Sequence, residues 1–251
     1  MDYFRTADEF KENNGYTIDG NWYPRVTRIV SIKSKPGLSN FYNEVGMAGA
    51  KAISAKSAEE GTLVHEVAEA LLMGDTPEIP SSIAPAIAAF RSFMEQKEIE
   101  IPEGGVERRI LHSEHRYAGT IDVLAKVNGK FGVLDIKTSR SIYRDYNLQT
   151  SAYVEALLDD FPDIETRWIL RIDQSERCAV CGATRRTKGG REKVHEARGG
   201  PSCAAHEWCE TEGIVEFQEF PDWKSDFEAF LGAKRLWEWE NEFWLKKIGY
   251  L

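Results

Sequence analysis

Apolar side chains recur at every third or fourth position in several stretches of the chain. The clearest is residues 58–73, AEEGTLVHEVAEALLM, whose repeat predicts an amphipathic helix. Further helices are predicted over 84–97, 146–158 and 222–247. Residues 23–46 lack a clear repeat, so we expect an irregular cap that leads into the first helix.

Other stretches have the pattern of β-strands. Residues 106–137 alternate apolar and polar positions, and 166–173 and 213–220 are shorter runs of the same kind. Strands and helices that follow one another along the chain predict an α/β domain with a central mixed sheet flanked by helices.

A hairpin within 106–137 brings charged residues together. Asn128-Gly129 is a strong signal for a two-residue hairpin loop, and it pairs flanking residues whose numbers sum to 257. That register sets Asp122 opposite Asp135 and leaves Lys137 on the same face as Asp135. Like charges placed opposite each other destabilise a sheet, so a compensating cation is expected there.

Two carboxylates and an ammonium on one face suit phosphodiester hydrolysis. The carboxylates can hold Mg²⁺ or Mn²⁺, while the lysine orients a water molecule or stabilises developing charge. The alternative is a surface hairpin that carries three solvated charges. Because the pattern D…DxK is short, it does not decide between the two by itself.

Four motifs in order extend the pattern: GTLVH at 61–65, YAGTID at 117–122, VLDIK at 133–137 and QTSAY at 149–153. Together they resemble the RecB-like branch of the PD-(D/E)xK nucleases, which shows G-x-x-x-H, G-x-x-D, D-x-K and Q-x-x-x-Y in this sequence. YPRVT at 23–27 is similar to the P-S-V-T of phage and mitochondrial genome maintenance exonucleases, with arginine in place of serine.

The resemblance implies a restriction-endonuclease-like core and a Mg²⁺- or Mn²⁺-dependent deoxyribonuclease, an exonuclease acting on single-stranded DNA or DNA ends. It also implies the residues of the site. The catalytic residues would be Asp122, Asp135 and Lys137, with Gln149 and Tyr153 positioning the DNA or the lysine. The metal ligands would be His65, Asp122, Asp135, the backbone carbonyl of Ile136 and, as the loosest match, Glu107.

All four cysteines lie in a predicted insertion at 174–212, which favours a metal-binding module over disulfides. A structural zinc site is expected, in which His206 could replace one cysteine. An iron-sulfur cluster is the alternative, but relatives with such clusters place one cysteine before the nuclease core. The expected ligands are Cys178, Cys181, Cys203 and Cys209.

Basic residues lie between the two cysteine pairs. We expect Arg185, Arg186 and Lys188 to contact the phosphate backbone, with a solvated flexible loop as the alternative. Farther along, Trp237 and Trp244 are seven residues apart, so they are expected to pack on the core rather than stack on bases.

Composition adds limits to this picture. The 251 residues predict a single nuclease domain over 1–251, and the net charge of −9 argues against binding nucleic acid through overall basicity. No run of 18 apolar residues occurs. We therefore expect a cytoplasmic protein, prokaryotic or phage-encoded, that contacts no membrane. Because no ATPase motif is present, any helicase or recombination partner is a separate chain. The competing function is a nucleic-acid-binding or scaffolding subunit of a repair, recombination or CRISPR-type complex.

Overall fold

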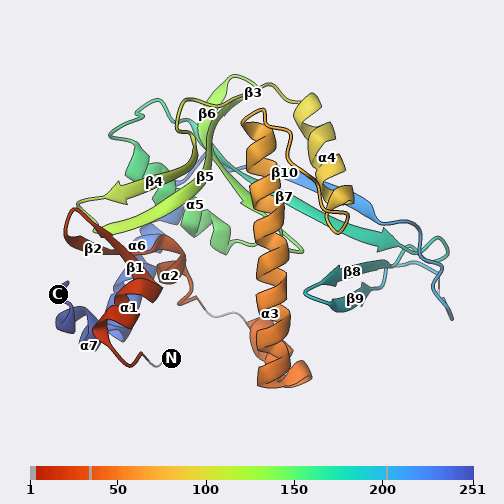
Figure 1. Ribbon diagram of the computed structural model, residues 1–251, viewed down its shortest axis with the longest axis horizontal. Helices are drawn as coiled ribbons and strands as arrows, with labels where there is room; N and C mark the ends of the chain where they lie inside the picture. Colours follow the sequence, from red (N-terminus) through yellow and green to blue (C-terminus); the bar gives the residue numbers. More distant parts are fainter. Residues whose placement is uncertain (1–3, 34–35, 202) are drawn as a thin grey trace.

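The computed structural model describes residues 4–33, 36–201 and 203–251 of the chain. It has an α/β architecture in which helices cover both faces of a mixed sheet, as predicted (Figure 1). No helix in these ranges is long and apolar enough to cross a membrane. The restriction-endonuclease-like part of the fold prediction stays a prediction.

The centre of the sheet is a hairpin joined to a parallel crossover. The hairpin has the predicted register from Val127↔Lys130 to Val123↔Leu134. Its second strand then runs parallel to a third, and a helix makes the connection between them, as parallel strands require. The principal strands are β4 (Val106–His112), β5 (Tyr117–Val127), β6 (Lys130–Lys137), β7 (Thr166–Arg177) and β10 (Glu212–Glu219).

Two helices cover one face of the sheet. Helix α3 (Pro36–Leu72) is much longer than the predicted helix over 58–73, and it is broken at Gly46, where φ is 71°. Helix α4 (Ala84–Glu95) agrees with the prediction and packs on β7 and β10. Val64 of α3 and Phe90 of α4 join the apolar cluster on this face.

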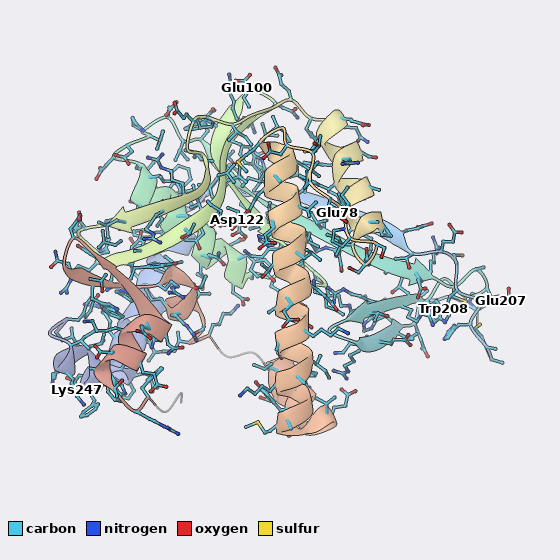
Figure 2. All side chains as sticks on the ribbon, viewed as in Figure 1. Glu78, Glu100, Asp122, Glu207, Trp208 and Lys247 are labelled. Carbon is cyan, nitrogen blue, oxygen red and sulfur yellow. The ribbon has the colours of Figure 1, made fainter. Side chains whose placement is uncertain are left out.

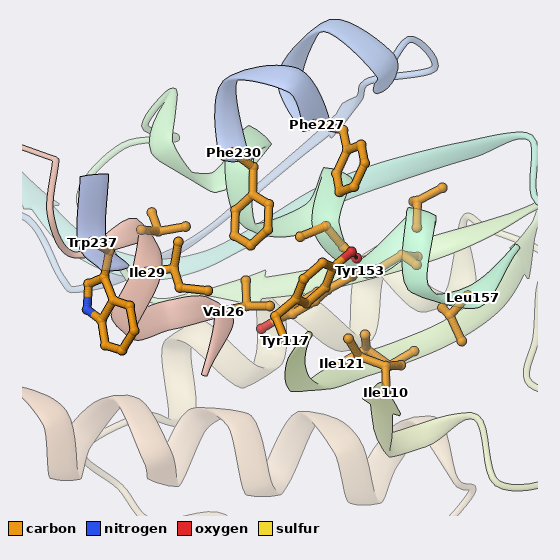
Figure 3. Packing of buried hydrophobic residues seen from close by; sticks show 14 of the residues in the cluster. Val26, Ile29, Ile110, Tyr117, Ile121, Tyr153, Leu157, Phe227, Phe230 and Trp237 are labelled. Atoms are coloured by element: carbon orange, nitrogen blue, oxygen red, sulfur yellow. Dashed lines mark hydrogen bonds between the residues drawn. The ribbon is translucent and has the colours of Figure 1, made fainter. Parts of the chain in front are cut away.

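The other face carries the remaining large helices. Helix α5 (Asp145–Leu157) and helix α6 (Lys224–Glu240) pack on each other, and Figure 3 shows Tyr153, Phe227 and Phe230 gathered over Tyr117 of the sheet. Trp237 is buried in the same cluster and Trp244 packs against it, which confirms the packing prediction. The predicted helix over 222–247 is two helices divided at Asn241.

The cysteine-rich insertion contains a hairpin that was not predicted. Strands β8 (Thr184–Lys188) and β9 (Arg191–His195) are joined by Gly189 and Gly190, both with positive φ. Gly-Gly between two strands is a recognised hairpin signal. The remaining elements are α1 (Ala7–Asn14), β1 (Gly15–Ile18), β2 (Asn21–Pro24), α2 (Val26–Val30), β3 (Ile99–Glu100) and α7 (Glu242–Lys247).

Candidate functional site

Strands β5 and β6 part at the position of Asp122. The ladder ends at Val123↔Leu134, one pair before the predicted Asp122–Asp135 pair. The Asp122 carboxylate lies at the gap and accepts a hydrogen bond of 2.7 Å from the backbone N–H of Ile136. A side chain thus takes the place of the next ladder hydrogen bond.

The alternation of side chains also changes at this point. Ile121 and Leu124 pack in the same apolar cluster although they are three residues apart, whereas Val123 packs in the cluster on the opposite face. Strict alternation would place Ile121 and Val123 together. The sheet is therefore distorted around Asp122, as often occurs next to functional sites. The two aspartates are neighbours, but not the simple opposed pair that the register alone predicted.

Asp135 is fully buried and held by polar side chains. Its Oδ2 lies 2.5 Å from Lys137 Nζ, and its Oδ1 accepts a hydrogen bond of 3.1 Å from Gln149. The same amide nitrogen donates to the Tyr153 hydroxyl at 2.9 Å. Gln149 and Tyr153 thus support the carboxylate rather than the lysine. Burial, reinforced by the Asp122 charge and opposed by Lys137, raises the pKa of Asp135 to about 6.

Helix α3 supplies two further candidate metal ligands close to Asp122. His65 Nδ1 lies 3.8 Å from Asp122 Oδ2 and 3.7 Å from Glu69 Oε1. One ligand atom from each of these three residues lies within 4.8 Å of the others, a spacing that could hold a metal ion. Burial lowers the pKa of His65, but the two carboxylates outweigh it and the net pKa is raised. Glu69 was not among the predicted ligands, although its position one helical turn after His65 is the signal for it.

Glu107 completes a row of acidic groups across the sheet. It lies between Val106↔Val123 and Arg108↔Ile121, opposite Asp122, with φ at 49°. A non-glycine residue in this conformation is uncommon and is enriched at functional sites. Glu107 is an exposed residue, but partial desolvation of its carboxylate, together with the charges of Glu69 and Asp122, raises its pKa to about 7. The weakest of the sequence matches therefore lies beside the other acidic residues.

Two motif glycines are explained by close packing. A Cβ on Gly119 would lie 2.7 Å from a ring carbon of Tyr153, so Tyr153 can pack against β5 only because residue 119 has no side chain. A Cβ on Gly61 would lie 2.9 Å from the Thr138 hydroxyl, where α3 crosses the end of β6. Both glycines therefore help to fix the spacing between the site's helices and its sheet.

The chemistry of this donor set fits a divalent cation. Several carboxylates converge, and Glu69 Oε1 is buried without a hydrogen-bond donor. Desolvation and neighbouring carboxylates raise the pKa values of Asp135 and Glu107, so a bound cation would stabilise the ionised form of both. Ile136 lines the groove next to His65 and Lys137, and its N–H is the group seen to contact Asp122.

The cysteine cluster forms at the base of the β8–β9 hairpin. Cys178 Sγ lies 4.0 Å from Cys203 Sγ, and Cys181 Sγ lies 3.4 Å from His206 Nδ1. These four residues form a Cys₃His group that could bind a metal such as zinc. Cys209, predicted as the fourth ligand, is exposed and outside the group, so His206 replaces it.

Thiolate character differs within this group. Burial disfavours the Cys178 thiolate, but hydrogen bonds from the Cys181 and Val180 backbone and from His206 outweigh it and lower the pKa of Cys178 to about 6. Burial and the neighbouring thiols raise the pKa of Cys203 to about 11. A bound cation would stabilise both thiolates at once. In Figure 2 Glu207 and Trp208, which follow His206 in this module, lie at the right-hand edge of the molecule, whereas Asp122 lies near its centre.

The predicted basic residues separate into two groups. Arg186 and Lys188 line a groove that also contains His65 and Lys137, and both donate to the carbonyl of Thr138. Arg185 does not line this groove. It pairs with Glu176 and lies over the ring of Trp208, 4.8 Å from its centroid, so its role is to fix the hairpin to the cysteine module.

Comparison with known proteins assigns no family to the chain: no protein-family model matches it, and neither does any curated protein at a significant level.

Proposed function

We propose that this chain is a metal-dependent DNA nuclease of the RecB-like PD-(D/E)xK type. The observation that carries the proposal is the strand separation at Asp122, which places its carboxylate beside Asp135, Lys137 and the α3 donors. Metal-dependent phosphodiester hydrolysis uses a cation next to a group that can orient water, and these residues could supply both functions.

Each residue has a role in the proposal. His65, Glu69 and Asp122 would hold a Mg²⁺ or Mn²⁺ ion, with Asp135 as a further ligand once Lys137 moves aside. The ion would neutralise the phosphate and lower the pKa of a bound water. Lys137, whose Nζ lies 5.1 Å from the Tyr146 ring centroid, would position that water or the scissile phosphate.

Gln149 would act through Asp135. Its amide donates to both Asp135 and Tyr153, so it fixes the rotamer of the carboxylate and leaves the other oxygen for Lys137 or a cation. Supporting groups of this kind commonly change metal affinity or activity by about 10–100-fold when they are removed.

End-labelled DNA provides the test. Wild-type protein with Mg²⁺ or Mn²⁺ is expected to degrade linear single strands or strand ends, whereas Asp135→Ala and Lys137→Met lose at least about a hundredfold in rate. Lys234→Met is the matched control, because Lys234 is also a lysine with little exposure that pairs with a carboxylate, Glu238, but it lies in α6. Equal cleavage by all four proteins would refute the assignment, and cleavage of circular DNA would favour an endonuclease.

A second function is favoured by the basic groove alone. A protein that binds nucleic acid without cutting it, as a subunit of a repair, recombination or CRISPR-type complex, would also need Arg186 and Lys188 beside the site. That function predicts DNA binding that Asp135→Ala leaves unchanged, with no metal-dependent cleavage by any variant.

A further inference from the structure

The groove beside the candidate site is strongly basic although the chain is acidic. It encloses about 960 Å³, and among the described residues that line it seven are lysine or arginine and one, Asp145, is acidic. The chain as a whole has a net charge of −9. Basic side chains are thus gathered along this groove, although Arg186 pairs with Asp173 and Arg191 with Glu44, and such a gathering is typical of a polyanion site.

The β8–β9 hairpin forms one wall and reaches across to α3. The backbone N–H of Gly189 donates to Glu60 Oε2 at 2.9 Å, and a Cβ on Gly189 would lie 2.3 Å from the carbonyl oxygen of Ile53. Arg191 pairs with Glu44 of α3 and lies over the Phe41 ring, 5.0 Å from its centroid. Figure 1 shows the hairpin pointing at the helix. The hairpin tip therefore bridges the groove instead of leaving it open.

Aromatic rings also line the groove. Tyr143 is 46% exposed and packs edge-on against Tyr146, with ring centroids 5.8 Å apart. Tyr146 in turn lies next to Lys137 of the candidate site. Cations interleaved with accessible aromatic rings are typical of surfaces that bind unpaired bases, because every base offers a face for stacking.

We propose that this groove is the binding site for a single, unpaired nucleic-acid strand, with the β8–β9 hairpin as a clamp that holds the phosphate backbone against α3. The proposal rests on the proposed function in one respect, that the strand leads to the candidate metal site. His65, Ile136 and Lys137 of that site line the groove. A duplex presents no unpaired base to Tyr143, and the hairpin tip, which contacts α3 at Gly189, bridges the groove that a duplex would have to enter.

Exposed basic side chains of the groove can be substituted without disturbing the fold. Arg140 and Lys193 are exposed and line the groove. Binding of a short fluorescein-labelled oligo(dT) is measured by anisotropy without added divalent cation, over a range of salt concentrations. For Arg140→Gln/Lys193→Gln we expect about tenfold weaker binding and a log–log salt slope smaller by about 1.4, which is about 0.7 per lost phosphate contact on a single strand.

The matched control is Lys224→Gln/Arg235→Gln, which makes the same change in net charge on the exposed surface of α6. It is expected to bind as wild type does. Equal loss of affinity in both double variants would overturn the proposal, as would binding of the duplex, or of polyglutamate, as tight as that of oligo(dT).

A second readout separates this inference from the proposed function. Hydrolysis of bis(p-nitrophenyl) phosphate with Mn²⁺ needs the metal site but not the groove, so the groove variant is expected to retain the wild-type rate. If the groove variant retained both ester hydrolysis and oligo(dT) binding, the groove proposal would be refuted but the proposed nuclease function would not. Lost oligo(dT) binding in the groove variant, with no ester hydrolysis by any protein, would support the groove and refute the nuclease.

Discussion

The Asp122 carboxylate accepts a hydrogen bond from the backbone N–H of Ile136, at the position where β5 and β6 separate. The Asp122 side chain thus accepts a hydrogen bond from a buried backbone N–H and also lies next to His65 of α3. The structural and the chemical roles of Asp122 can be separated by substitution.

Asp122→Asn keeps an oxygen acceptor for Ile136, whereas Asp122→Ala removes it. Without metal we expect the Asn variant to be at least as stable as wild type, and the Ala variant to lose about 1–3 kcal/mol because a buried N–H is left unpaired. Urea unfolding measures this difference. Both variants are expected to lose Mn²⁺-dependent hydrolysis, and an active Asn variant would show that the carboxylate is not a ligand.

Glu107 predicts a pH dependence of stability. Its pKa in the folded protein, about 7, is above the usual value of 4.5, so the folded state binds the proton more tightly than the unfolded state. Stability from this group is therefore present at low pH and is lost as pH rises from about 4.5 to about 7. Metal-free Glu107→Gln should become progressively more stable relative to wild type across that range in urea titrations.

Glu103→Gln is the control for this pH effect, because Glu103 is exposed, as Glu107 is, but lies in the loop that precedes β4 rather than opposite Asp122. It should show no such trend. Saturating Mg²⁺ is expected to reduce the advantage of Glu107→Gln, since a cation relieves the same repulsion. A constant difference between Glu107→Gln and wild type at every pH would contradict the prediction.

Gly119→Ala tests the packing of Tyr153 on the sheet. Because the added methyl group would lie 2.7 Å from the ring, we expect a loss of about 1–3 kcal/mol and weaker hydrolysis as Tyr153 and Gln149 shift. Gly232→Ala is the matched control in α6, where the added methyl group meets nothing within 4 Å. It should gain up to about 1 kcal/mol from helix propensity. Equal effects in the two variants would exclude a specific role for Gly119.

Removal of the metal predicted at the Cys₃His group should release the β8–β9 hairpin. Cys181→Ser is expected to lose bound zinc, measured by elemental analysis, and to become sensitive to trypsin within 184–198. Cys209→Ser should keep both zinc and resistance, since Cys209 lies outside the group. A brown, iron-containing preparation would show that the group holds an iron-sulfur cluster and not zinc. Full zinc content in Cys181→Ser would refute the ligand set.

Local signals in the sequence predicted the parts of the site that depend on near neighbours. Asn128-Gly129 fixes the register of β5 and β6 through residues close in sequence, so the register could be predicted without tertiary information. The change of face around Asp122 was not, because it depends on which apolar cluster Ile121 and Val123 join on the two faces of the sheet. Neither strand's own pattern of apolar positions reveals that separation.

The metal cluster shows the same limit. C-x-x-C predicted Cys178 and Cys181, but the choice between His206 and Cys209 depends on how the chain returns to Cys178, where Trp208 forms a β-bridge. Gly189-Gly190 did carry a local hairpin signal. The position of that hairpin against α3, however, is a long-range contact that composition and periodicity do not encode.

The bridge between Gly189 and Glu60 joins residues 129 positions apart in the chain. Contacts of such high sequence separation have a large loop-closure cost and form slowly, whereas the β5–β6 hairpin is local and fast. We therefore expect the Asp122 region to be protected early in refolding, and the bridge to α3 to close among the last steps. In hydrogen exchange of the native protein, the amide of Gly189 should correspondingly open at a lower free energy than those of β5 and β6.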